Sequence, residues 1–168
     1  MESLEIFLLQ FVLTLSVVGL LARWYLAPWL AQKQLQIALG ILIIPHAFRH
    51  IGMTFLTPAV VADTMPQGFA MAAGYGDLAS GILALLALVA LRRDWAVAIG
   101  LVWIFNIVGS VDLLNALRQA EAVPHFAAAW YIPTFLVPLL IVSHVMIFAR
   151  LLKRTSQPST HLQESPAS

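Results

Sequence analysis

Long apolar stretches with few charged residues dominate the sequence. Five segments reach the length of about 20 mainly apolar residues that a transmembrane helix needs. They cover residues 4–22, 35–56, 69–91, 95–117 and 130–152. Runs such as LASGILALLALVAL lack the alternation of apolar and polar positions found in the strands of membrane barrels. The pattern predicts an all-α integral membrane bundle of five transmembrane helices, which forms a single domain over residues 1–152.

The last segment of the chain has a different composition. Residues 153–168 are polar and rich in Ser and Pro, and they lack the apolar residues that a packed core requires. We expect this segment to be a disordered tail.

The distribution of Lys and Arg predicts the orientation of the bundle. Positively charged residues gather in the cytoplasmic connections of membrane proteins. Five spans place Arg118 on one side of the membrane and seven basic residues on the other: Arg23, Lys33, Arg92, Arg93, Arg150, Lys153 and Arg154. We therefore expect the N-terminus outside, the C-terminus in the cytoplasm, and a multi-pass protein of the inner membrane.

The overall composition excludes several classes of protein. Hydrophobic residues make up 61% of the chain and charged residues 10%, whereas a soluble domain carries about 25% charged residues. The net charge is +1, so nucleic acid is not an expected partner. The absence of Cys excludes disulfides and thiolate metal sites. The lipid bilayer is the predicted partner, and a homo-oligomer or a partner membrane subunit stays open because five short helices make a small bundle.

Ionisable residues inside the predicted spans indicate where a functional site lies, because they are costly in a membrane. At a rise of about 1.5 Å per residue, most of them fall at one level in the outer half of the bundle. His144 falls slightly to the cytoplasmic side of the centre. The predicted cluster consists of His46, Arg49, His50, Asp77, Asp112 and Asn115.

The spacing of His46 and His50 suggests a metal site. Two His residues four apart share one face of an α-helix and can reach one ion. Asp77, Asp112 or His144 are candidates for further ligands, and two His with two carboxylates suit a divalent metal. Haem held between His46 and His144 is the other cofactor that the pattern allows. The alternative is that these His residues only pack and form hydrogen bonds.

Arg49 needs a negatively charged partner inside the membrane. Asp77 lies toward the start of its predicted helix, where the helix dipole favours a negative charge. Asp112 lies toward the end of its helix, where the dipole disfavours one, so we expect a cationic neighbour such as Arg49, a protonated His or a metal. A structural ion pair and a clamp for an anionic ligand both remain open for Arg49.

The order of these polar motifs resembles small bacterial multi-pass inner-membrane proteins of unassigned function. The resemblance rests on IPHAFRHIG, YGDL, NIVGSVDLLN and WYIPTFLVPLLIVSHV, and it covers residues from about 40 to 150. It implies a membrane bundle and carries no activity, ligand or catalytic role.

Three functions are consistent with the sequence. The first is a site for a metal ion or haem in the outer half of the bundle. The second is a small-molecule carrier or a lipid-modifying membrane enzyme that uses Arg49 as an anion clamp. The third is a structural network of ion pairs in a membrane subunit. The sequence leaves open which of these applies and whether the protein is an enzyme.

Overall fold

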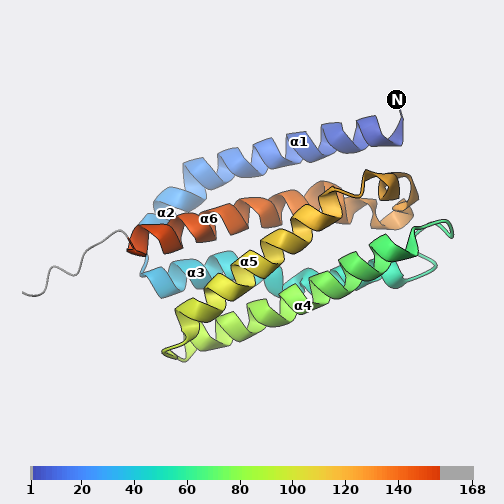
Figure 1. The fold of residues 1–168 in the computed structure, drawn as a ribbon. Coiled ribbons are helices and arrows are strands. Elements are labelled where there is room, and N and C mark those ends of the chain that lie inside the picture. The colour runs from blue at the N-terminus through green and yellow to red at the C-terminus, as the bar shows by residue number, and fades with distance from the viewer. Residues whose placement is uncertain (1, 156–168) are drawn as a thin grey trace, which may run out of the picture.

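The computed structural model describes residues 2–155, and all its regular elements in that range are helical (Figure 1). The first span joins α1 (Ser3–Leu21), a π-helical turn η1 (Ala22–Leu26) and α2 (Ala27–Ala31). The second joins α3 (Leu35–Ile43) to the 3-10 segment η2 (Ile44–Leu56). Two long α-helices follow, α4 (Gln67–Arg92) and α5 (Ala98–Leu117).

The last span begins after two short 3-10 segments, η3 (Ala120–His125) and η4 (Ala127–Trp130). It contains a π-helical segment η5 (Ile132–Leu136) and α6 (Val137–Thr155). Most of the predicted tail, residues 156–168, lies outside the described residues.

Five helical segments of the described chain are long and apolar enough to cross a membrane. They run over Ser3–Ala31, Leu35–Leu56, Gln67–Arg92, Ala98–Leu117 and Ala127–Lys153. The predicted all-helical character and the number of helical segments long and apolar enough to span a membrane are therefore confirmed, and the second segment has the predicted limits. The first span is longer at its end because helical structure continues through the aromatic residues that follow Ala22.

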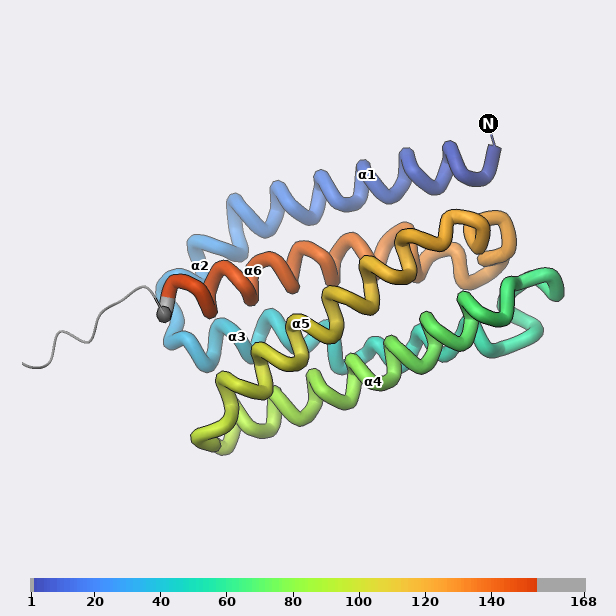
Figure 2. Tube along the Cα trace, viewed as in Figure 1, coloured from blue at the N-terminus to red at the C-terminus, as the bar shows by residue number. Residues whose placement is uncertain are grey.

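The helices form a bundle in which α1 lies apart on one side (Figures 1 and 2). It packs mainly against α6 and the segments η3 and η5, and most of its apolar side chains are exposed. The second span and α4 pack closely along their lengths, and α5 packs on α4 and α6. The N-terminus, the connection 57–66 and the segment 118–131 lie at one end of the bundle, which we name the loop end.

Two apolar clusters fill the bundle. One lies toward the end opposite the loop end and includes Leu39, Ala84 and Ile147. The other lies at the loop end and includes Phe55 and Phe126. Each helix of the inner bundle has its buried polar residues between the stretches that contribute to these two clusters. The buried polar residues thus form a layer between two apolar layers.

The second half of the second span is a 3-10 helix, which corrects the expected α-helix. A Pro at position 45 has no N–H to donate to the carbonyl of Leu42, three residues earlier. The hydroxyl of Ser143 on α6 donates to this carbonyl at 2.6 Å instead. Since a 3-10 helix has 3.0 residues per turn, residues four apart differ by about 120° in direction. The prediction that His46 and His50 share one face is therefore wrong: His46 is buried and His50 is exposed.

Candidate functional site

Arg49 lies at the centre of the polar layer, with 1% of its surface exposed. Its Nε donates to Oδ1 of Asp77 at 2.7 Å, and its Nη2 donates to Oδ2 of Asp112 at 2.5 Å. Its Nη1 donates to the backbone carbonyl of Gly109 at 3.1 Å. All three nitrogens of the guanidinium are thus bound to oxygens from α4 and α5.

Three glycines make the room that these charged groups occupy. A Cβ added at Gly52 would collide with the carboxylate of Asp77, and one at Gly76 would collide with the carboxylate of Asp112. A Cβ at Gly109 would lie 2.8 Å from Nη1 of Arg49 and 2.8 Å from Cε1 of His144. The guanidinium and the imidazole of His144 therefore lie side by side over Gly109.

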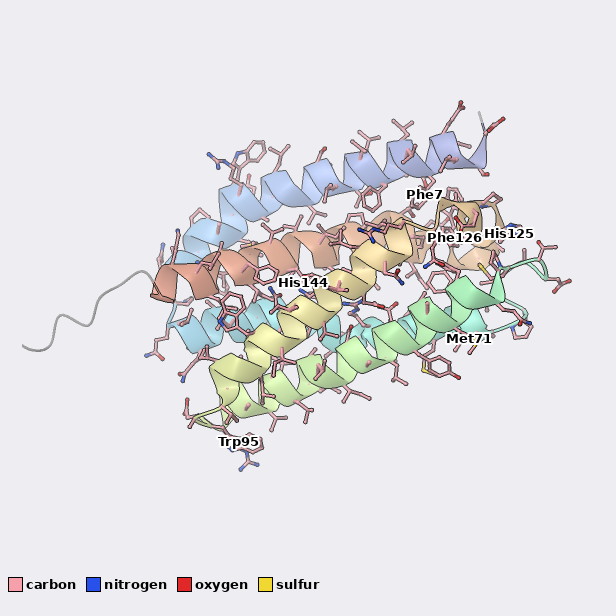
Figure 3. All side chains as sticks on the ribbon, in the orientation of Figure 1. Phe7, Met71, Trp95, His125, Phe126 and His144 are labelled. Carbon is pink, nitrogen blue, oxygen red and sulfur yellow. The ribbon has the colours of Figure 1, made fainter. Side chains whose placement is uncertain are left out.

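Two buried imidazoles form the second part of the polar layer (Figure 3 labels His144). Nδ1 of His144 lies 2.6 Å from Oδ1 of Asn106, whose amide donates to the carbonyl of His144 at 3.2 Å. The rings of His46 and His144 have centroids 4.2 Å apart, and Phe105 lies against both. Both ring nitrogens of His46 and Nε2 of His144 are buried without a hydrogen-bond partner.

A small cavity adjoins the carboxylates on the side of the loop end. Its volume is about 90 Å³, and Asp77 and Asp112 line it together with apolar residues of α1, α4 and α5. The two carboxylate side chains are 14% and 16% exposed, whereas the side chain of Arg49 is fully buried. A ligand in the cavity therefore meets the carboxylates and not the guanidinium.

Hydrogen bonds hold the two parts of the loop end together beside this cavity. Nδ1 of His125 and the hydroxyl of Thr64 lie 2.8 Å apart, and the amide of Ala62 donates to the carbonyl of His125 at 3.0 Å. The amide of Ala128 donates to the carbonyl of Val60 at 3.0 Å. These bonds join the connection 57–66 to the segment that contributes Val123 and Phe126 to the cavity wall.

The expected cationic neighbour of Asp112 is present, and it is Arg49. The physical reason differs from the one the sequence suggested. Asp77 lies ten residues into α4, and Asp112 lies five residues before the last residue of α5. Because the helix dipole acts within the first and last turn, it does not separate the two acids here. Burial of the guanidinium is the stronger reason for both contacts.

The other predicted residues separate into different environments. His50 is exposed, and its Nδ1 lies 3.2 Å from the carbonyl of Ala47 on its own segment. Asn115 is also exposed, and its carbonyl accepts a hydrogen bond from Gln119. His144 lies beside His46. The cluster of six predicted from depth therefore contains Arg49, Asp77 and Asp112, with His46 and His144 next to it.

The donors do not assemble into the metal site of His46, His50 and the carboxylates that the sequence suggested, nor into a haem site. Among residues 2–155, no three His, Asp or Glu side chains come together as a metal site. Imidazoles bind metals at about 2.0–2.1 Å from the ring nitrogen, so two rings on opposite sides of one haem iron place their nitrogens about 4 Å apart. Their centroids then lie still further apart than the 4.2 Å between His46 and His144.

Several residues of the site have no motif that identifies each of them individually in the sequence. Gly52, Gly76 and Gly109 matter because charged groups from other helices approach them. Asn106 lies one turn before Ser110, but its pairing with His144 depends on how α5 and α6 pack. A glycine in each of three spans at the level of the charged residues is the one pattern that indicates close approach there.

One comparison with known proteins identifies a family. The family model described as a domain of unknown function (DUF8737) matches residues 6–152, a range that includes every residue of the site. No curated protein and no solved structure matches the chain.

Proposed function

The chain belongs to the DUF8737 family, and we propose that it is a membrane carrier that binds a small monovalent cation at Asp77 and Asp112. One observation carries this proposal. The two carboxylates share a single buried guanidinium, and both open onto the same cavity.

The charge of the cluster favours a cation. Two carboxylates and one guanidinium leave one net negative charge when all three groups are ionised. An unbalanced charge in the membrane interior is costly, so one further positive charge stabilises the cluster. A monovalent cation or a proton in the cavity supplies this charge.

Arg49 acts in this proposal as a positioning residue. Its Nε and Nη2 hold one oxygen of each carboxylate, which fixes both groups at the floor of the cavity. Its nitrogens already bind Asp77, Asp112 and the carbonyl of Gly109, and its side chain does not reach the cavity surface. These contacts weigh against the anion clamp considered from the sequence.

Transport through the site requires the bundle to change shape. An apolar cluster that includes Leu42 and Phe105 lies on the far side of the polar layer. We place the loop end outside the inner membrane, so the cation enters from that side and the apolar cluster closes the route to the cytoplasm. Lipid, or a second copy of the chain, covers the exposed apolar face of α1.

The test is cation binding by the purified protein in detergent. Unfolding temperatures are measured in NaCl, KCl and choline chloride, with N-methylglucamine chloride keeping the ionic strength constant as a cation too bulky for the cavity. At least one of the smaller cations should raise the unfolding temperature saturably, because a ligand that binds only the folded state stabilises it.

Asp112→Asn is the decisive variant. It leaves the neutral pair of Arg49 and Asp77 and should lose the cation effect while remaining folded. Asp63→Asn, at an exposed position in the connection 57–66, is the control and should behave as the wild type. Cation effects that are equal in wild type and Asp112→Asn would contradict a site at these carboxylates, and so would no effect in either.

A metal held by His46 and His144 is a second candidate function. It is favoured by the buried ring nitrogens of these residues that have no hydrogen-bond partner. Imidazole suits copper and zinc. The guanidinium of Arg49 beside His144 places a positive charge next to this pair, which weighs against it.

Elemental analysis of the purified protein tests the second candidate. Near-stoichiometric metal in the wild type, lost in His46→Ala and kept in His50→Ala, would support it. The two variants remove the same group from the same 3-10 segment, but only His46 is buried. Metal-free folded wild type, or equal loss in both variants, would reject this site.

A further inference from the structure

We propose that the ligand of the cavity is a small organic ammonium ion, an inference that rests on the cation site proposed above. The cavity combines an acidic floor with an aromatic wall. Phe7, Phe55, Phe69 and Phe126 line it together with Asp77 and Asp112.

The aromatic wall comes from four separate parts of the chain. Phe7 belongs to α1, Phe55 to η2 and Phe69 to α4, while Phe126 lies between η3 and η4. Ring centroids are 5.3 Å apart for Phe55 and Phe69, 5.5 Å for Phe69 and Phe126, and 6.1 Å for Phe7 and Phe126. Figure 3 shows Phe7 and Phe126 approaching each other at the loop end.

Aromatic rings and a carboxylate together suit an alkylated nitrogen cation. The negative face of an aromatic ring attracts a cation, and cages of such rings bind quaternary and methylated ammonium groups. The alkyl groups of the ligand fill the apolar parts of the wall, while the carboxylates balance its charge.

The wall does not suit a bare metal ion. Calcium takes six to eight oxygen ligands, and magnesium requires six in octahedral geometry. The cavity offers two carboxylates, and most of its other lining residues are apolar. An inorganic cation would have to keep most of its water in a cavity with few polar groups to bind that water.

The size of the cavity limits the ligand. One water molecule needs about 10–15 Å³ of such space, so the cavity of about 90 Å³ holds the equivalent of about six to nine waters. Tetramethylammonium and choline are in this range, and N-methylglucamine is larger. The expected ligand is therefore an ammonium ion with short substituents.

The test compares three probes on the purified full-length protein by titration calorimetry. Choline and tetramethylammonium carry the charge, and 3,3-dimethylbutan-1-ol is the neutral analogue of choline with the same shape. Both ammonium ions should bind, while the neutral analogue should not. Sodium and potassium at equal concentration should compete weakly.

Two aromatic variants separate the wall from the floor. Phe69→Leu keeps an apolar side chain in the wall but removes the aromatic face, and it should weaken choline binding by about 2- to 30-fold. Phe48→Leu is the control, because Phe48 is exposed on η2 and does not line the cavity. An unfolding temperature near that of the wild type shows that Phe69→Leu still folds. If Phe69→Leu does not fold, a pair of variants at Phe126 takes its place. Phe126→Tyr keeps the aromatic ring, and Phe126→Leu removes it.

The outcomes distinguish this inference from the function on which it rests. Sodium or potassium binding that depends on Asp112 but exceeds choline binding would overturn the ammonium ligand and keep the cation site. Equal choline affinity in wild type and Phe69→Leu would do the same. If no cation has an effect on the wild type, both the ammonium ligand and the cation site are overturned. Binding of the neutral analogue as tightly as choline would show that the cavity is only an apolar pocket.

Discussion

Arg49 has two carboxylate partners, and this number decides how the cluster responds to substitution. Removing one carboxylate leaves a neutral pair, whereas removing both leaves a buried charge with only the carbonyl of Gly109 as a partner. A buried charge without its partner destabilises a protein by about 3–5 kcal/mol, while replacing a whole ionic group with neutral residues is often tolerated.

The effects of these substitutions on the free energy of unfolding should therefore not be additive. Asp112→Asn should have a free energy of unfolding close to that of the wild type. Asp77→Asn/Asp112→Asn should be less stable than the wild type by about 3–5 kcal/mol. Adding Arg49→Met to the double variant should recover most of that loss. Unfolding titrations in mixed detergent measure the three variants. Equal stability of the single and double variants would contradict the buried position of Arg49.

Gly109 is a second position where the cluster is sensitive to substitution, because a single added carbon atom would collide with it. A Cβ there would lie 2.8 Å from the guanidinium of Arg49 and from the ring of His144. Gly109→Ala should destabilise the protein by about 1–3 kcal/mol, as added atoms do in a packed core. Gly100, on the same helix, has nothing within 4 Å of its added Cβ. Gly100→Ala should be neutral or stabilising by up to about 1 kcal/mol, because Ala favours helix more than Gly. Thermal unfolding of the two variants gives the comparison, and equal effects would contradict the close approach at Gly109.

Among the elements, the 3-10 segment η2 places the site. Over the six residues from Ile43 to Arg49, a 3-10 helix turns about 120° further than an α-helix. An α-helical second span would therefore point Arg49 away from the carboxylates that it contacts. The hydroxyl of Ser143 supports the start of η2 by donating to the carbonyl of Leu42 at 2.6 Å.

Removal of this hydroxyl should weaken both the fold and the site. Ser143→Ala leaves a buried carbonyl unpaired, which costs about 1–3 kcal/mol. Ser16→Ala is the matched control, because Ser16 is exposed and donates to the carbonyl of Val12 within its own helix. Unfolding titrations should separate the two variants clearly. A Ser143→Ala protein as stable as Ser16→Ala would show that η2 does not depend on this contact.

The same element shows what the sequence could and could not predict. Apolar runs determine the five spans, because a helix that crosses a membrane needs little more than length and hydrophobicity. Depth along each helix is enough to predict that Arg49, Asp77 and Asp112 lie at one level. The same prediction is wrong for His50, because the 3-10 geometry of η2 depends on tertiary contacts: Ser143 on another helix and the close packing of Gly52 against Asp77. The pairing of His46 with His144 depends on the same packing.

At the scale of the whole molecule, any transport depends on which side of the membrane each end of the bundle faces. Lys33, Arg92 and Arg93 lie at the end opposite the connection 57–66: Lys33 is between α2 and α3, Arg92 is the last residue of α4, and Arg93 follows it. Arg118 follows α5 at the loop end. The positive-inside rule predicts that the loop end, and with it the cavity, faces away from the cytoplasm. In this orientation, the proposed cation would reach Asp77 and Asp112 from outside.

The chain contains no Cys, so a single introduced Cys reports the side of the membrane without background. Ala59→Cys at the loop end and Gln32→Cys at the other end change exposed, uncharged residues and leave the charge distribution intact. A membrane-impermeant maleimide applied to intact spheroplasts should label Ala59→Cys, and it should label Gln32→Cys only after permeabilisation. Ile82→Cys, on an apolar face of α4 that we place in lipid, should remain unlabelled in both conditions.

The reverse pattern would place the cavity on the cytoplasmic side, so that the proposed ligand would have to be a cytoplasmic cation. Labelling of Ile82→Cys in the folded protein would contradict the membrane location of α4 itself.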